Sequence, residues 1–211
     1  MRTGLGARSE ARARATKKSE QTRERLLDAA AKVFRDKGYA GARLSDIAER
    51  AEMHVPGVYY YFASKEDLVE EVLRAGVAKA CGFVEERVAA VPDGSPALDR
   101  LRAAIEGRVL VVLEIGDYTS ANIRIFGQLP DEIRRHHLAQ QRAYGDLWRS
   151  LLEGARAAGE LRDDVDLSVI RMLILGALNW TVEWYRPGDL TAAEVARNAT
   201  TMICEGLSAN R

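Results

Sequence analysis

Cysteine, histidine and long apolar runs are scarce in this chain of 211 residues, and each scarcity excludes a class of protein. Its two cysteines, Cys81 and Cys204, lie far apart and lack the spacing of metal ligands, so we expect two free thiols. The longest apolar stretches are far too short to cross a bilayer, so no membrane partner is expected. The basic N-terminus also lacks the apolar segment of a signal peptide, and the sequence therefore predicts a cytoplasmic protein.

The residue groups that carry out catalysis are also missing. The three histidines, His54, His136 and His137, have no nucleophile motif beside them, and the His136-His137 pair is expected to be solvated on a polar helix. No glycine-rich phosphate loop and no cluster of metal ligands occurs in the sequence. We therefore expect no catalytic activity, no cofactor and no bound metal.

The net charge is zero, with 31 basic and 31 acidic residues, but the two signs are distributed unevenly. Residues 1–62 hold 13 of the Lys and Arg residues and 8 of the Asp and Glu residues, whereas residues 63–211 carry a net charge of −5. Residues 1–18 are especially basic and are expected to be disordered, or helical only on binding. Either a polyanionic partner or simple solvation of a tail would explain this arm.

Helical periodicity runs through the rest of the chain and predicts an all-α protein of about nine helices without a sheet. Gly38 is placed to cap the end of the first helix, and Ser64 has the position of a helix N-cap. Thr191 and Glu194 have the spacing of a capping box for the last helix. The expected helices cover residues 22–37, 44–51, 55–61, 64–90, 96–116, 119–127, 130–158, 166–185 and 191–207.

Residues 44–62 have the pattern of a helix-turn-helix, with a tight turn at residues 52–54. Ile47, Ala48 and Val58 can pack together at the crossing, and Pro56 pre-sets the start of the second helix. A helix of this kind can enter the major groove with its N-terminal residues at the base edges. The pattern therefore favours a DNA-binding unit.

Over residues 22–73 the chain resembles the TetR family of bacterial repressors. The matching residues are Arg23-Glu24-Arg25-Leu26-Leu27-Asp28-Ala29-Ala30, Phe34, Gly38-Tyr39, Asp46-Ile47-Ala48, Val58-Tyr59-Tyr60-Tyr61-Phe62 and Ser64-Lys65-Glu66-Asp67-Leu68. The resemblance implies a helix-turn-helix DNA-binding domain at residues 19–63, and a larger helical domain at residues 64–211 for ligand binding and dimerisation. Arg43 departs from the family's usual Ser or Thr N-cap, and residues 52–54 from its small turn, so the operator cannot be taken from relatives.

The resemblance places Tyr59 and Lys65 where the family contacts phosphates, with core packing as the alternative for Tyr59. Tyr60 and Phe62 are expected chiefly in the core, and Val55 could offer an apolar contact to a thymine methyl group. The DNA-binding candidates are Arg43, Ser45, His54, Val55, Pro56, Gly57, Tyr59, Tyr60 and Lys65.

In the family the second domain forms the dimer and the effector pocket. Residues 166–185 have too much apolar surface for one partner, which favours a symmetric homodimer through Met172, Gly176, Trp180, Val195 and Met202. Side chains from several helices could line an apolar cavity, although core packing explains each one singly. The ligand-binding candidates are Phe83, Leu110, Tyr118, Ile123, Arg124, Phe126, Tyr144, Trp148, Leu175, Asn179 and Trp184.

Residues 176–188 resemble the C-terminal signature of TetR-type repressors of fatty-acid and sterol degradation, including the actinobacterial branch that represses sterol-ring (cholesterol) degradation. This likeness implies a hydrophobic effector, an acyl-CoA thioester, that releases the repressor from a palindromic operator. Arg124, Arg134 and Arg135 could then meet the phosphates of the coenzyme. Two alternatives remain, a drug or antibiotic sensor that controls efflux and a DNA-binding protein without an effector, and Trp180 and Trp184 could serve the dimer alone.

Overall fold

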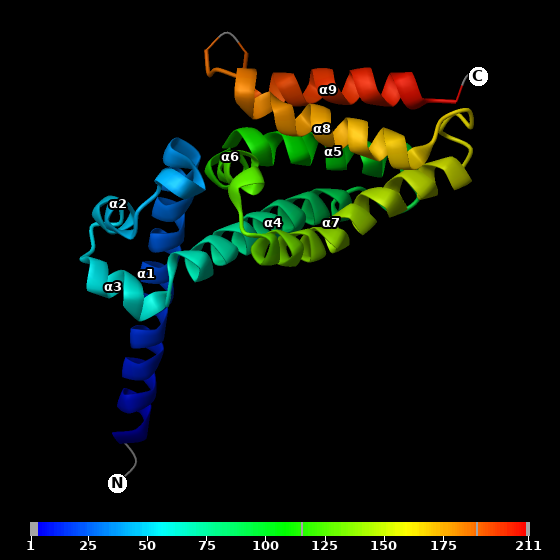
Figure 1. Cartoon of the computed structure of the whole chain (residues 1–211). Helices are drawn as coiled ribbons and strands as arrows, with labels where there is room; N and C mark the ends of the chain where they lie inside the picture. The colour runs from blue at the N-terminus through cyan, green and yellow to red at the C-terminus, as the bar shows by residue number, and fades with distance from the viewer. Residues whose placement is uncertain (1–3, 115, 189, 210–211) are drawn as a thin grey trace.

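The computed structural model describes residues 4–114, 116–188 and 190–209, and these form nine α-helices, one short 3-10 turn and no strand (Figure 1). The elements in chain order are α1 (Gly4–Gly41), α2 (Leu44–Arg50), α3 (Val55–Tyr61), α4 (Lys65–Ala89), α5 (Ala97–Glu114), α6 (Gly116–Ile125), η1 (Phe126–Gln128), α7 (Asp131–Ala157), α8 (Leu167–Trp184) and α9 (Ala192–Leu207). The all-α prediction is confirmed. None of the described helices is long and apolar enough to cross a membrane.

Local capping interactions place the helix ends close to their predicted positions. The Ser64 hydroxyl accepts a hydrogen bond from the Asp67 backbone N–H at 3.0 Å and begins α4. At the start of α9, the Glu194 N–H donates to the Thr191 hydroxyl at 3.2 Å, and the Thr191 N–H donates to Oε2 of Glu194 at 2.8 Å. Gly159 ends α7 with a φ of +72°. These ends were predictable because each cap joins residues that are neighbours in sequence.

Helix α1 differs from the prediction in its N-terminal half. Residues 4–18, expected to be disordered or helical only on binding, continue α1 as helix without a partner present and extend away from the rest of the molecule (Figure 1). Alanine, arginine, lysine and glutamate predominate in this segment and have high helix propensities. Because the packed part of α1 supplies the nucleus, each further residue adds to an existing helix. Residues 1–3 of the expected arm lie outside the described part of the chain.

At its other end α1 is interrupted at Gly38, which confirms the predicted cap. Gly38 has a φ of +70° and a ψ of 176°, a conformation that side chains with a Cβ atom rarely adopt. A Cβ atom there would lie 3.0 Å from Oε1 of Gln128. The same oxygen accepts a hydrogen bond from the Ala40 N–H at 3.2 Å. The end of α1 therefore also contacts η1 of the larger domain.

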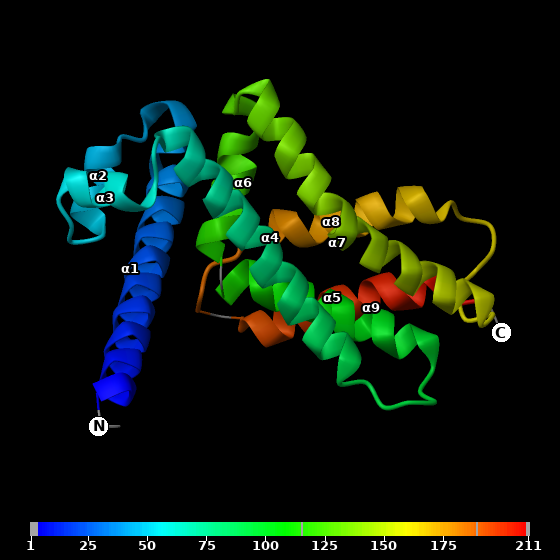
Figure 2. The ribbon, with the colours of Figure 1, turned by 90° about the horizontal axis from the view of Figure 1, so that it is seen from below.

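Buried apolar side chains form two clusters. The first joins α1, α2 and α3 to the first half of α4 and to α6, and it contains Phe34, Ile47, Leu68 and Ile125. The second joins α5, α7, α8 and α9 around Trp148. Figure 2 shows α6 lying beside α1, close to the start of α4. The three-helix unit therefore shares its core with α4 and α6.

Candidate functional site

Helices α2 and α3 cross at a small buried contact, as the sequence predicts for a helix-turn-helix. Ile47, Ala48 and Val58 are buried at this contact. In the turn, the Met53 N–H donates to the Ala48 carbonyl at 2.8 Å, and Glu52 has a left-handed φ of +54°. Glycine or asparagine adopts this conformation more readily than glutamate. The turn keeps its path because the buried contact on either side holds it.

Arg43 begins α2 without using its own side chain as a cap. Its backbone N–H donates to Oδ2 of Asp46 at 3.1 Å, and Oδ1 of Asp46 lies 2.9 Å from Nζ of Lys37. The Arg43 side chain is exposed. Asp46 thus supplies only the reciprocal half of a capping box, in which the N3 side chain accepts from the N-cap backbone, and the Arg43 guanidinium is not engaged in the cap.

The exposed face of α3 carries two tyrosines. Val58 and Phe62 are buried, whereas Tyr59 is more than half exposed and Tyr60 is 81% exposed. The core prediction is confirmed for Phe62 and wrong for Tyr60. The reason is that positions 55, 58 and 62 form the inward face at helical spacing, which directs Tyr60 to the opposite side. Core packing of Tyr59 is excluded in the same way.

Lys65, the first residue of α4, is held beside the end of α1 by an aromatic contact. Its Nζ lies 4.4 Å from the centroid of the Tyr39 ring, and the Tyr39 hydroxyl donates to Oε1 of Glu66 at 2.7 Å. Burial and this hydrogen bond raise the pKa of Tyr39 to about 12, so Tyr39 remains a donor at neutral pH. Most other DNA-binding candidates are exposed on or beside α2 and α3, namely Arg43, Ser45, His54, Pro56, Tyr59 and Tyr60, while Val55, Gly57 and Lys65 are partly buried.

A cavity of about 340 Å³ lies among α4, α5, α6, α7 and α8. Four ligand-binding candidates line it, namely Tyr118, Tyr144, Leu175 and Asn179. Met172 and Gly176, which the sequence assigns to the dimer interface, line it as well. The other lining residues are Leu73, Gly76, Val77, Ala80, Arg108, Thr119, Asn122, Gln141, Gly145 and Arg171.

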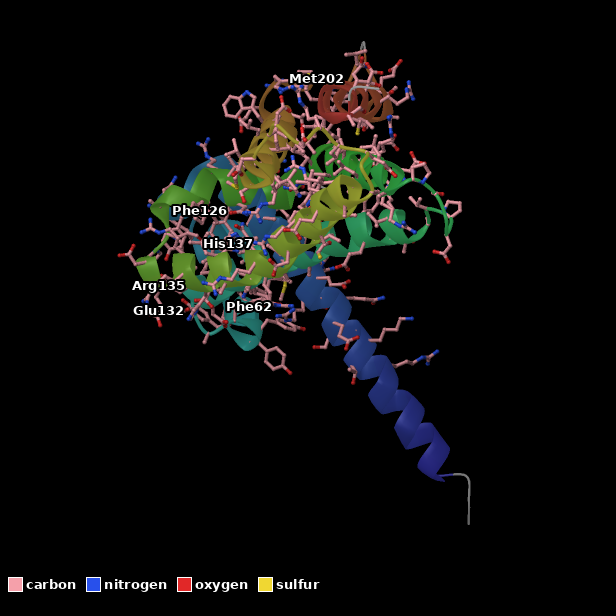
Figure 3. The ribbon with its side chains drawn as sticks, turned by 90° about the vertical axis from the view of Figure 1, so that its right-hand side faces the viewer. Phe62, Phe126, Glu132, Arg135, His137 and Met202 are labelled. Carbon is pink, nitrogen blue, oxygen red and sulfur yellow. The ribbon has the colours of Figure 1, made fainter. Side chains whose placement is uncertain are left out.

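The remaining ligand-binding candidates do not line this cavity. Trp148 is wholly buried in the second core, Ile123 is exposed, and Trp184 is exposed elsewhere on α8. Phe126 packs against His137, with ring centroids 6.1 Å apart (Figure 3). His137 is only 2% exposed, so the expectation of a solvated pair is wrong for His137 and confirmed for His136. The others outside the lining are Phe83, Leu110 and Arg124. Which face of each helix meets the cavity depends on how the helices cross, and the spacing of apolar residues does not specify it.

Arg134 and Arg135, expected near coenzyme phosphates, also lie outside the cavity lining. Arg134 forms an ion pair with Asp131 in the first turn of α7. Arg135 lies at the outer edge of the molecule beside Glu132 (Figure 3). Both are thus surface residues at the start of α7, whereas the cavity meets α7 further along, at Gln141.

Two arginines that the sequence did not single out line the cavity. Arg108 is only 8% exposed, and its Nε donates to Oδ1 of Asn179 at 3.1 Å. Arg171 donates from Nη1 to the Gly145 carbonyl at 3.1 Å. A signal was present for Arg108, since it lies directly before the apolar run Val109–Leu113. If such a run is buried, a charged residue at its edge is costly unless it serves an interaction.

Tyr118 connects the cavity to α1. Its hydroxyl donates to Oδ1 of Asp28 at 2.7 Å, and Nζ of Lys79 lies 4.1 Å from the centroid of its ring. Burial raises the pKa of Tyr118, with Asp28 adding to the effect, so the hydroxyl stays protonated. An ion pair between Arg35 and Asp117 joins the same two helices. The ring of Tyr118 also lines a second, more polar hollow between α1 and α6.

The outer face of α8 and α9 is apolar and exposed. Trp180, Trp184 and Met202 are each more than half exposed, and a shallow hollow between the two helices is lined by these residues together with Val195. Figure 3 places Met202 at the far side of the molecule from Phe62. Trp180, Val195 and Met202 of the predicted interface therefore share one surface, separate from the exposed face of α3.

Within the described ranges, no group of His, Cys, Asp or Glu side chains could hold a metal ion. Cys81 and Cys204 are both free thiols. Burial raises the pKa of each to about 11, so both remain protonated and weakly nucleophilic at neutral pH.

Comparisons with known proteins agree with this geometry. The transcriptional repressor KstR2 of Rhodococcus jostii (strain RHA1) is 29% identical over 88% of this chain and 91% of its own length. The solved structure of the ketosteroid transcriptional regulator KstR2 of Mycobacterium tuberculosis has a TM-score of 0.78 at 23% identity, covering 89% of this chain and 95% of that one. The structure of AibR in complex with isovaleryl coenzyme A and operator DNA has a TM-score of 0.75 at 26% identity, covering 86% of this chain and 97% of that one.

Both parts of the chain also match family models. Residues 26–72 match the bacterial regulatory proteins of the tetR family, and residues 94–207 match the tetracyclin repressor-like C-terminal domain. Relatives of this kind are regulators and not enzymes, in agreement with the catalytic groups missing from the sequence. With the helix-turn-helix and the helical domain both matched, the chain belongs to the TetR family of transcriptional repressors.

Proposed function

We propose that this repressor binds a pseudo-palindromic operator as a homodimer and is released from it by an acyl-CoA thioester. The observation that carries the proposal is the cavity, because Tyr118 in its lining donates a hydrogen bond to Asp28 on α1 of the DNA-binding unit. A ligand in this cavity would touch α4 and α6, the helices that complete the core of that unit.

The exposed tyrosines of α3 support contact with DNA. Tyr59 offers a hydroxyl, and Lys65 offers a cation at the start of α4. Contacts of this kind to phosphates position a protein on DNA without reading its sequence. We expect Lys65→Ala to weaken binding to all sequences alike and to reduce the slope of log affinity against log salt by about 1. An unchanged slope would remove Lys65 from the contacts.

The apolar face of α8 and α9 supports a homodimer. Exposed tryptophan and methionine side chains grouped around a hollow are unfavourable in water, and such patches mark protein interfaces. A two-fold axis through this face would pair each helix with its copy. The resulting dimer would carry one α3 on each protomer, so half-sites roughly 34–36 Å apart, or a multiple of that, are expected.

An acyl group suits the cavity because apolar side chains form much of its wall, with Leu73, Val77 and Leu175 among them. AibR, a fold neighbour, was solved with an acyl coenzyme A and operator DNA. A cationic drug suits it less well, since the charged residues of the lining are Arg108 and Arg171. To shift a repressor from mostly bound to mostly released, the ligand must prefer the released state by roughly 5.5 kcal/mol.

The test is a titration of operator-bound protein with long-chain and sterol-derived acyl-CoA thioesters. Coenzyme A and the free acids are the controls. Release at micromolar concentration by a thioester and not by coenzyme A supports the proposal. If a cationic drug binds and no thioester does, an efflux sensor replaces it. If thioesters bind but operator affinity is unchanged, the ligand stands and the release mechanism fails.

A further inference from the structure

Among the described residues, the charges of the cavity lining are all of one sign. Arg108 and Arg171 are the charged residues of this lining, which includes no described aspartate or glutamate. In the described part of the chain, Arg108 is bonded to the neutral amide of Asn179, and Arg171 to a backbone carbonyl. Hydrogen bonds to neutral groups do not offset the charge of a guanidinium in a site of low dielectric constant. The cavity therefore has a positive potential that an anion would neutralise.

Uncommitted hydrogen-bond donors accompany this charge. The buried Tyr144 hydroxyl, whose oxygen faces the donors Trp148 and Arg108, has no acceptor for its own proton among the described residues, and Nε of Arg171 likewise has no acceptor there. The Arg108 guanidinium lies 5.6 Å from the centroid of the Tyr144 ring, so a positive group and a hydroxyl donor are neighbours. Buried donors of native proteins nearly always have a partner. Five other buried polar atoms of the described residues also lack a partner, but only Tyr144 and Arg171 of this group line the cavity, where a bound ligand could supply the acceptor.

From these observations we infer that the cavity contains a carboxylate subsite, formed by Arg108, Arg171 and the Tyr144 hydroxyl. A carboxylate suits the planar guanidinium, which can donate two parallel hydrogen bonds to it. The rest of the lining is largely apolar and the volume, about 340 Å³, is at the small end for ligand pockets. The effector is thus a hydrocarbon body that carries a carboxylate at its buried end.

The inference rests on the proposed function, because it concerns the ligand of the same cavity. The subsite would recognise a carboxylate on an apolar body, and two kinds of ligand have this chemistry. One is a free fatty or sterol-derived acid. The other is an acyl-CoA whose acyl chain ends in a second carboxylate, with the coenzyme outside the cavity.

The experiment compares two pairs of ligands that differ in one group, by isothermal titration calorimetry on the full-length protein. The first pair is dodecanoate and dodecanol. The second is the coenzyme A monothioester of dodecanedioic acid and dodecanoyl-CoA. We expect the carboxylate member of at least one pair to bind about tenfold more tightly or better, since hydrogen bonds to charged groups are the strong ones. The pair that shows the preference identifies the source.

The variant Arg108→Gln should abolish that preference while leaving the neutral member of the pair bound as before. Arg142→Gln, at an exposed position of α7 outside the cavity lining, is the matched control and should change neither ligand. Circular dichroism and size-exclusion chromatography check the fold and oligomeric state of each variant. If Arg108→Gln does not fold, Tyr144→Phe replaces it and should reduce the preference roughly three- to tenfold through one lost hydrogen bond.

Equal binding within both pairs overturns the subsite, as does a preference that Arg108→Gln or Tyr144→Phe leaves intact. These results are distinguishable from failure of the proposed function. If both thioesters bind equally and release the operator, the acyl-CoA effector stands and the subsite fails. If dodecanoate binds through Arg108 and neither thioester binds, the subsite stands and the thioester effector fails.

Discussion

Replacing Tyr118 by phenylalanine removes one hydroxyl at the junction between the ligand cavity and the DNA-binding unit. The hydroxyl donates to Oδ1 of Asp28 on α1 at 2.7 Å, and the ring lines the cavity from α6. Phenylalanine keeps the ring in place and loses the bond across the two helices. The variant therefore tests whether this bond couples ligand binding to the position of α1.

The magnitude follows from the environment of the acceptor. A hydrogen bond to a charged group contributes about 1.5–3 kcal/mol when its partners are shielded from water. The Asp28 side chain is 52% exposed, so water replaces much of the lost bond. Lys79 also remains 3.4 Å from Asp28 and keeps it paired. We therefore expect the free energy of unfolding to fall by about 1 kcal/mol, below the shielded range.

This free energy of about 1 kcal/mol also limits the effect of the substitution on ligand-dependent operator release. If the whole bond is broken when ligand binds, its removal changes the ratio of operator Kd with ligand to operator Kd without ligand by up to about fivefold. Urea unfolding at one fixed protein concentration measures the stability change. Fluorescence anisotropy of labelled operator, at zero and saturating ligand, measures the ratio.

Tyr39→Phe is the matched control. Tyr39 also donates to a carboxylate at 2.7 Å, to Glu66, but this bond is outside the cavity lining. It should lower stability slightly and leave the ligand-dependent ratio unchanged. If Tyr118→Phe loses stability but keeps the wild-type ratio, the bond is structural only. If it changes neither quantity, our reading of the junction is refuted.

Three further predictions concern backbone conformation, an ion pair and a thiol. Gly38→Ala should lower the free energy of unfolding by about 1–2 kcal/mol, because Gly38 has a left-handed φ of +70°. Gly154→Ala, within α7 and with open space around it, should raise the free energy of unfolding by about 0.5–1 kcal/mol in the same urea assay. Equal effects of the two substitutions would contradict this reasoning. Hydrogen bonding from Arg74 holds the pKa of Glu71 below its ordinary value, so Glu71 contributes stability above about pH 4.3 that is lost as the pH falls through its lowered folded pKa. Glu71→Gln should therefore reduce the fall in the free energy of unfolding as the pH is lowered below about 4.3. An unchanged fall would count against the ion pair between Glu71 and Arg74. Cys81, whose pKa is raised to about 11, should react with iodoacetamide at neutral pH more slowly than free cysteine, which thiol labelling followed by mass spectrometry checks.

Much of the fold was predictable because its signals are local. Ser64 and Thr191 begin helices through bonds to residues three positions on, and Gly38 ends one through its own backbone conformation. The buried contact of the helix-turn-helix, with Ala48 and Val58, likewise lies within one short segment. The helix boundaries and the family therefore followed from the sequence. The helical state of residues 4–18 did not, because it depends on the packed remainder of α1.

The site depended on the tertiary structure, because it lies where helices distant in sequence cross. Trp148 and Tyr144 are one helical turn apart on α7, yet Trp148 is wholly buried in the core and Tyr144 lines the cavity. Arg108 and Asn179 are 71 positions apart in the chain, and they meet only because α5 and α8 pack side by side. Sequence spacing shows that a helix has an apolar face, whereas the crossing of its neighbours decides whether that face meets a core, a cavity or a partner.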